Sequence, residues 1–596
     1  MRFSLRSILN FGLVLLAWMF SWGQCFSAGK ISVSELNYHD VEDPELEFIE
    51  LINVGIGSIT LTGAQFTKSI TYTFTTPTTL TTGERIVIVK NRAKFIARYG
   101  STGIRLAAGE FTGRFADEGE LVTLSDSSGL TLMSFTYSPK GSWPSRPDGL
   151  GSTLECVHPD ENLDTPENWR ASAEWMGSPG IAGTGPQKTV VINEILAHTD
   201  PPLEDAIELI NLTSKSVDIG GWYVSNTRTN PRKFRIPDGT IIPANGYKVF
   251  YELANTRSPA GFNSSGTGNS PDFTFNSAHG DEAVLLSADS AGNPKYWMDT
   301  VSFEATANGI SIGRYPNGTG KFTTLVQPTF GTEITATLPA EFLTVFRTGK
   351  GASNAEPLIG PIVFSRIQYH PTTGADEFVE LLNISSAAVP LYDPLYPTNT
   401  WKLSGGVGFD FPTGVVMESG ARLIVVPIDP AAFRMKYSIP SSIPIYGPWT
   451  NLLNNAGEVV AIYMPDPPQL PPHPDAGFVP YVLVEEVDYS PLPPWPTEAD
   501  GSGPALLRKI PVQFGNEPTS WEVERTTPAE PPQLSISIIP MGVRLSFTSE
   551  TGRTYRLEQQ SSLMDIWTDQ GLIPANGGLV QVDLGPKSGF YRVRVE

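Results

Sequence analysis

The heptapeptide Glu47-Phe-Ile-Glu-Leu-Ile-Asn53 decides the fold, because closely similar heptapeptides recur twice further along the chain. The second copy reads Asp205-Ala-Ile-Glu-Leu-Ile-Asn211 and the third reads Glu377-Phe-Val-Glu-Leu-Leu-Asn383. Their central glutamates, Glu50, Glu208 and Glu380, are 158 and 172 residues apart. Because solenoid repeats are only about 20 to 50 residues long, this spacing predicts three domain-sized copies of one fold.

Each heptapeptide occupies the same place in a longer series of short apolar segments. A segment that ends in histidine precedes it, at 31–39, 191–198 and 362–370. A turn with an apolar segment follows, at 82–89, 244–250 and 419–426, and then a hairpin-like segment, at 117–124, 279–286 and 455–462. Copies one and three also share two late tryptophans, Trp143 and Trp169 in one and Trp495 and Trp521 in the other.

Short segments of this kind, separated by Gly, Asn, Asp and Pro, are typical of antiparallel β-sandwiches. We expect only short helices, at 92–99 and 430–437, since no stretch shows a long helical period. The 56 glycines and 52 prolines among 596 residues fit many strands joined by many turns. The sequence therefore predicts an all-β protein.

The chain has a formal net charge of −21. An acidic surface repels phosphate backbones and anionic lipid headgroups, so the charge disfavours nucleic acid and anionic membranes as partners. It is compatible with neutral polymers, divalent cations or simple solubility.

The N-terminus has the pattern of a signal peptide that ends near residue 28. Arg2 and Arg6 precede an apolar run at 8–20, and the small residues Ser27 and Ala28 follow. The alternatives are an uncleaved membrane anchor and lipid attachment at Cys25. Cleavage predicts a secreted or cell-surface protein with no integral membrane span in the mature chain. Its single remaining cysteine, Cys156, is then expected to be a buried hydrophobic residue.

The composition divides the chain as follows. We predict a signal peptide at 1–28, sandwiches at 30–183, 189–332 and 361–527, a linker at 333–360 and a small C-terminal β module at 533–596. The C-terminal module is expected from strongly alternating segments such as Val543-Arg-Leu-Ser-Phe547. It resembles short β modules that close many large exported bacterial proteins.

The ordered landmarks resemble the lamin tail domain family. The similarity rests on the strand with Glu-Leu-x-Asn, on Gly221-Trp222, on the Gly-centred hairpins and on the late tryptophans. Copy three departs from the pattern, because Arg366 replaces the first glutamate, and copy two lacks the late Trp-Pro motif. The resemblance implies tandem immunoglobulin-like β-sandwiches with a binding or tethering role at the cell exterior, in an exported bacterial protein.

The repeated heptapeptide offers the first candidate residues. In a period-two strand Ile49 and Leu51 face the core and Glu50 faces away from it. We interpret the glutamates as structural groups that accept backbone N–H bonds, with the asparagines shaping the next turn. A repeated ligand carboxylate is the alternative reading. The motif residues are Glu50, Asn53, Glu208, Asn211, Glu380 and Asn383.

Three of the six histidines, His39, His198 and His370, occupy matching positions and are followed by acidic loops. A cation site formed by each histidine with its loop carboxylates is one hypothesis. The other is a strand-end histidine bonded to a loop carbonyl. The Asp-Gly-x-Gly segments that begin at Asp148 and Asp500 are read as tight turns, since they lack the ligand spacing of an EF-hand.

The aromatic residues offer a further candidate site, because exposed rings can stack on sugars. The candidates are Trp222, Trp401, Trp449, Tyr392 and Tyr396, with core packing as the alternative. The sequence has no HExxH and no complete phosphate-binding loop.

We therefore predict a non-catalytic exported protein for binding, tethering or scaffolding, without a cofactor or a metal. Its partner would be an extracellular protein or polysaccharide, and not nucleic acid. An accessory glycan-binding protein is the main alternative, and an exported hydrolase with a site shared between modules is the more distant one. The ligand and the oligomeric state are not predicted.

Overall fold

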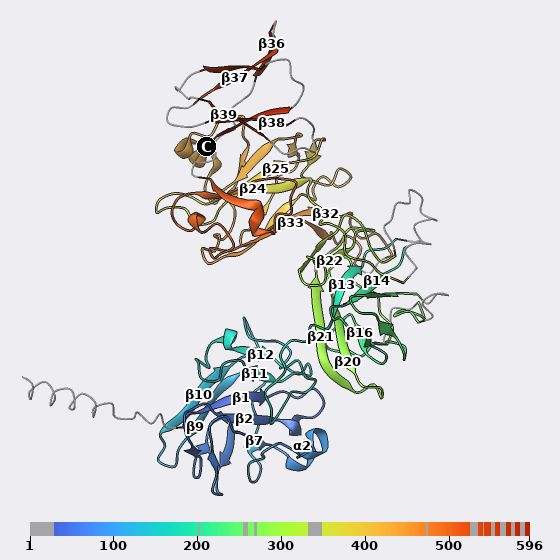
Figure 1. The fold of residues 1–596 in the computed structure, drawn as a ribbon, viewed down its shortest axis with the longest axis vertical. Coiled ribbons are helices and arrows are strands. Elements are labelled where there is room, and N and C mark those ends of the chain that lie inside the picture. The colour runs from blue at the N-terminus through green and yellow to red at the C-terminus, as the bar shows by residue number, and fades with distance from the viewer. Residues whose placement is uncertain are drawn as a thin grey trace, which may run out of the picture. The chain divides into compact units, whose positions relative to one another are not determined.

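The computed structural model describes residues 29–596, apart from 201–202, 254–259, 267–270, 332–348, 473–474, 525–534, 540–541, 550–554, 561–567, 574–578, 585–589 and 596 (Figure 1). The predicted signal peptide at 1–28 lies outside the described residues. The chain forms two compact units, Met1–Leu358 and Ile359–Glu596. In the first unit lie two β-sandwiches, and in the second lie a third sandwich and a small β module.

The first sandwich packs two five-stranded antiparallel sheets around one core. The first sheet runs β12 (Trp169–Ala171), β11 (Leu154–Cys156), β1 (Ile31–Asn37), β2 (Phe48–Asn53) and β7 (Arg85–Val89). The second runs β10 (Thr131–Tyr137), β9 (Glu120–Ser125), β4 (Gln65–Phe66), β5 (Ile70–Thr73) and β8 (Thr112–Gly113). A two-stranded sheet, β3 (Ile59–Thr60) with β6 (Thr79–Leu80), and helix α2 (Arg92–Tyr99) complete it.

The second sandwich repeats this plan with its own core. Its first sheet runs β23 (Lys321–Thr324), β22 (Ile312–Tyr315), β13 (Val190–Leu196), β14 (Ala206–Asn211) and β19 (Tyr247–Tyr251). Its second runs β17 (Phe234–Arg235), β16 (Tyr223–Ser225), β20 (Asp281–Ala288) and β21 (Pro294–Phe303), and β15 (Val217–Asp218) pairs with β18 (Ile241–Ile242).

The third sandwich has the same order again. Its first sheet runs β35 (Trp521–Glu524), β34 (Ala505–Arg508), β24 (Ile362–Gln368), β25 (Phe378–Asn383), β30 (Arg422–Val425) and β31 (Ile445–Tyr446). Its second runs β28 (Phe409–Asp410), β27 (Lys402–Gly405), β32 (Glu458–Pro465) and β33 (Tyr481–Tyr489). The sheet β26 (Val389–Pro390) with β29 (Val416–Met417) and helix α4 (Pro430–Tyr437) complete it.

The C-terminal module consists of two three-stranded antiparallel sheets around a core of Leu545, Phe547, Tyr555, Leu557 and Ile573. The sheets run β36 (Ser535–Ile539), β37 (Gly542–Thr548), β40 (Leu579–Leu584), and β39 (Thr568–Ile573), β38 (Tyr555–Gln560), β41 (Phe590–Val595).

The prediction of tandem immunoglobulin-like sandwiches is confirmed, and α2 and α4 begin and end at the predicted residues. The late tryptophans play the same part in two copies. Trp169 lies 6.0 Å from Trp143 between ring centroids, and Trp521 lies 6.3 Å from Trp495. Cys156 is buried and unbridged, as expected, and burial raises the pKa of its thiol to about 12.

Candidate functional site

A β-bulge lies at the same place in the first strand of each sandwich. The register with the next strand shifts between Val33 and Glu35 in β1, between Ile192 and Glu194 in β13 and between Phe364 and Arg366 in β24. A bulge leaves two residues opposite one, so both point to the same face of the sheet. The bulged pair therefore lies opposite the central glutamate of the repeated heptapeptide, on the face away from the core.

The first bulged residue donates to that glutamate in every copy. The hydroxyl of Ser34 lies 2.5 Å from Glu50, the amide of Asn193 lies 2.7 Å from Glu208, and the hydroxyl of Ser365 lies 2.7 Å from Glu380. All three glutamates are at most 1% exposed. Glu50 points away from the core, as the alternation of the strand predicts, but other segments of the chain cover this face.

In the first sandwich the cover is the segment 176–183. Its backbone N–H groups donate to the carboxylates, from Ser178 to Glu35 at 2.8 Å and from Gly180 to Glu50. Arg85 adds an ion pair with Glu50 at 3.0 Å. The pKa of Glu35 is raised well above its usual range, first by burial and then by the neighbouring Glu50.

In the second sandwich the cover comes from residues 329 and 349–354. The N–H of Thr329 donates to Glu194 at 3.0 Å, and that of Ala352 donates to Glu208 at 3.0 Å. Burial raises the pKa of Glu194 to about 7. Burial also raises the pKa of Glu208 well above its usual range, and the charge of Glu194 adds to this effect. Residues 349–358, within the segment predicted as a linker, thus pack on the second sandwich.

In the third sandwich ion pairs stabilise the buried glutamate. Arg366, which replaces the first glutamate, donates to Glu380 at 2.8 Å. Arg422 donates to the other oxygen of the same carboxylate. Copies one and two therefore hold two adjacent buried carboxyl groups, whereas copy three holds one carboxylate between two guanidinium groups.

The repeated asparagines shape the turn after the second strand. Asn53 donates to the carbonyls of Gly57 and Leu80, at 2.7 and 2.9 Å, and accepts from the N–H of Gly55 at 3.0 Å. Asn211 and Asn383 make the corresponding bonds in their copies. These residues tie the turn to a neighbouring strand.

Each of the three histidines bonds a residue far along the chain. His39 Nδ1 lies 2.7 Å from Asp148, His370 Nδ1 lies 2.5 Å from Asp500, and His198 Nδ1 lies 2.7 Å from the carbonyl of Thr306. The Asp-Gly-x-Gly turns and the strand-end histidines, treated separately in the sequence analysis, are thus brought together in copies one and three. Among the residues that the structure describes, no group of three or more His, Cys, Asp or Glu side chains could hold a metal ion.

Most of the candidate sugar-stacking rings lie in the cores. Trp222, Trp401 and Trp449 are at most 8% exposed and belong to the cores of the second and third sandwiches. The stacking role proposed for these tryptophans is therefore wrong. Tyr396 is 38% exposed and Tyr392 is half-buried.

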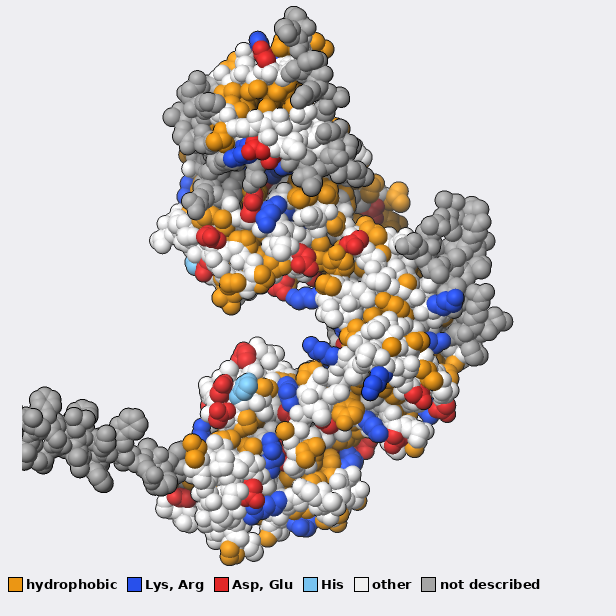
Figure 2. Space-filling model, in the orientation of Figure 1, with side chains coloured by type: hydrophobic (Ala, Val, Ile, Leu, Met, Phe, Trp, Pro, Cys, Tyr) orange, Lys and Arg blue, Asp and Glu red, His pale blue; other side chains and the backbone are white. Residues whose placement is uncertain are grey.

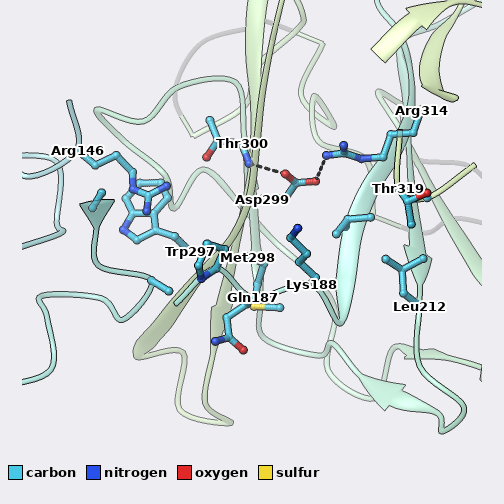
Figure 3. Close-up of a pocket in the computed structure, with 15 residues that line it drawn as sticks. Arg146, Gln187, Lys188, Leu212, Trp297, Met298, Asp299, Thr300, Arg314 and Thr319 are labelled. Atoms are coloured by element: carbon cyan, nitrogen blue, oxygen red, sulfur yellow. Dashed lines mark hydrogen bonds and ion pairs between the residues drawn. The ribbon is translucent and has the colours of Figure 1, made fainter. Parts of the chain in front are cut away.

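A cleft at the joint of the first two sandwiches was not foreseen from the sequence. It has a volume of about 340 Å³, and Arg146, Lys188, Trp297 and Arg314 are among the residues that line it (Figure 3). The cleft draws on segments from both sandwiches and on the connection between them. No single sequence motif encodes it, which is why motif reading missed it.

The family model of the lamin tail domain matches residues 184–304. These residues contain most of the second sandwich, from β13 to β21. No curated protein matches the chain. The match supports the resemblance in copy two, and copies one and three share its strand order and its bulge but lie outside the matched range.

Proposed function

We propose that this chain is a non-catalytic exported protein that binds or scaffolds partners through three lamin-tail-like sandwiches. The observation that carries the proposal is the burial and internal hydrogen bonding of the repeated glutamates. Each is buried and is bonded by groups of its own sandwich or of the segment that covers it. The feature that recurs three times is thus used to hold the fold together, which suits a scaffold.

The extension of the family to all three sandwiches is supported by their common strand order and by the bulge opposite the repeated glutamate. Repetition of one module suits a binder, because linked modules raise the effective concentration of one another's sites. On the face shown in Figure 2, acidic and basic side chains are interspersed among uncharged ones. A mixed surface of this kind suits a soluble scaffold better than a nucleic-acid binder.

Export is supported by the pattern of residues 1–28. In the part of the chain that the structure describes, no helix is long and apolar enough to cross a membrane. A fusion of residues 1–28 to a reporter that is active only outside the cytoplasm tests export. The matched control replaces both Arg2 and Arg6 by Glu, which should abolish reporter activity.

The binding role is tested by immobilising residues 29–596 and capturing partners from the native cell envelope. We expect one extracellular protein or polysaccharide to be retained and eluted specifically. Turnover of a polysaccharide, ester or phosphoester that a single point substitution abolishes would overturn the non-catalytic proposal.

A further inference from the structure

The first two sandwiches are joined by a short strand pairing and by a pair of tilted aromatic rings. The N–H of Trp175 donates to the carbonyl of Lys295 at 2.8 Å, and the N–H of Trp297 donates to the carbonyl of Ala173 at 2.7 Å. The rings of Trp175 and Trp297 lie 5.6 Å apart, and the guanidinium of Arg146 lies 5.2 Å from the Trp297 ring. The C-terminal tail of the first sandwich thus pairs with β21, an edge strand of the second sandwich. This pairing fixes the orientation of the two sandwiches at the joint.

The cleft of about 340 Å³ lies against this joint. Figure 3 shows Gln187 and Lys188, from the segment between the sandwiches, on the same cavity as Trp297 and Asp299 of β21. Volumes of this order, at an interface between domains, are typical of small-molecule sites. The lining combines aliphatic groups with hydroxyl and amide groups that can bond a ligand; these residues are Val191, Leu212, Met298, Gln187, Thr300 and Thr319.

The charge of the cleft is opposite to that of the chain. Three cationic side chains line it, Arg146, Lys188 and Arg314, against one acid, Asp299. Asp299 is already satisfied, because it accepts from Arg314 at 2.8 Å and from the N–H groups of Ile192 and Thr300 at 2.9 Å. In a chain with a net charge of −21 this excess of positive charge is a local feature.

Two of these cations have no carboxylate within 4 Å in the part of the chain that the structure describes. Lys188 is exposed at the cleft. Arg146 donates only to neutral oxygens, the hydroxyl of Ser152 at 3.1 Å and the carbonyl of Ser172 at 3.0 Å. Burial, with Arg228 nearby, lowers the pKa of Arg146 to about 10. A negative charge bound in the cleft could pair with Lys188, and the positive potential of Arg146 would favour it.

We propose that this cleft binds a sugar acid, a pyranose ring that carries a carboxylate. The carboxylate pairs with Lys188, the hydroxyls bond the amide and hydroxyl groups of the lining, and the apolar face of the ring packs on Met298 and Leu212. The sugar is either a free uronic acid or the terminal residue of an acidic polysaccharide. This inference rests on the proposed binding function and names a ligand class for it.

The test is calorimetric titration of residues 29–596 with glucuronate, with an oligomer of galacturonate, and with glucose as the neutral control. We expect both acids to bind and glucose to bind at least 10-fold more weakly. Tighter binding of the oligomer identifies the polymer as the source, and equal affinities per sugar identify the free acid. Equal binding of glucose and glucuronate, or binding of neither acid, overturns the proposal.

Two variants locate the site. Lys188→Glu should weaken glucuronate at least 10-fold without a change in melting temperature, because Lys188 is exposed. Lys215→Glu is the matched control, since Lys215 is also exposed in the second sandwich but does not line the cleft. Equal affinities of the two variants contradict the site. Suppose that neither the wild-type protein nor Lys188→Glu binds glucuronate, but both still capture a partner from the envelope. This result rejects the sugar acid as the ligand and leaves the proposed binding function intact.

Discussion

At the scale of single residues, the adjacent carboxyl groups of copies one and two make stability depend on pH. Glu194 and Glu208 are buried neighbours with raised pKa values. A raised carboxyl pKa means that the folded state favours the protonated form. The stabilisation is then complete below the unfolded pKa, near 4.5, and is lost as the pH rises towards the folded pKa, about 7 for Glu194.

Glu194→Gln tests this dependence, because glutamine keeps the shape and cannot ionise. Between pH 5 and pH 8 the wild-type protein should lose on the order of 3 kcal/mol more stability than the variant. Three groups donate to Glu194: the N–H and the hydroxyl of Thr329 and the hydroxyl of Ser311. Glutamine can still accept from both groups of Thr329, and its amide can donate to the hydroxyl of Ser311. Urea unfolding at the two pH values provides the measurement, and equal losses would show that Glu194 carries no raised pKa.

Copy three should respond in a different way, because its glutamate is paired with arginine. Arg366→Met leaves Glu380 buried with only Arg422 as a cationic partner. Removing one partner of a buried ion pair costs about 3 kcal/mol. Lys509→Met is the control, since Lys509 is exposed in the same sandwich and should change stability by less than about 0.5 kcal/mol. The melting temperatures of both variants are measured by calorimetry. Equal melting temperatures would contradict a stabilising role for the ion pair between Arg366 and Glu380.

At the scale of elements, the spacing of core residues in the first strand indicates a bulge, but the bulge was not predicted. The core positions of the first strand are Ile31, Val33 and Leu36. Strict alternation predicts a spacing of two, whereas Val33 and Leu36 are three apart, as a bulge requires. Sandwich strands, turns and both helices followed from local patterns. The cover over the outer face did not, because it depends on segments more than 100 residues from the strands they cover.

The cover also explains a glycine. Gly177 has a φ of +94°, and a Cβ there would lie 2.2 Å from the Glu35 carboxylate. Gly177→Ala should therefore destabilise the first sandwich by about 3 kcal/mol, since both backbone strain and overlap must be relieved. Gly83→Ala isolates the strain, because Gly83 has a φ of +79° and nothing within 4 Å of the added Cβ. We expect it to cost about 1 kcal/mol in the same chemical unfolding experiment. If both variants lose the same free energy of unfolding, the segment 176–183 does not pack closely against Glu35.

At the scale of the whole molecule, the joint connects the first two sandwiches within one compact unit. The counterpart of Trp297 in the first sandwich is Thr131, which pairs with Ser125 as Trp297 pairs with Leu286. The aromatic contact is thus particular to this joint and is not a property of the repeated fold. Sequence comparison between the copies shows Trp297 as a departure but cannot show its partner, Trp175, because the two residues lie in different sandwiches.

Trp175→Ala tests whether the joint is held by this contact. The substitution removes the ring that contacts Trp297 and leaves the core of the first sandwich intact, since Trp175 is outside it. Because aromatic pairs contribute about 0.5 to 1.5 kcal/mol beyond their burial, the joint should open roughly 10-fold more often. Limited proteolysis reads this opening as faster cleavage in the connection at 183–189. The control is Tyr396→Ala, an exposed ring in the second unit, which should leave the cleavage rate unchanged. Cleavage of Trp175→Ala at the wild-type rate would mean that the backbone pairing at Glu174 and Tyr296 holds the two sandwiches without the rings.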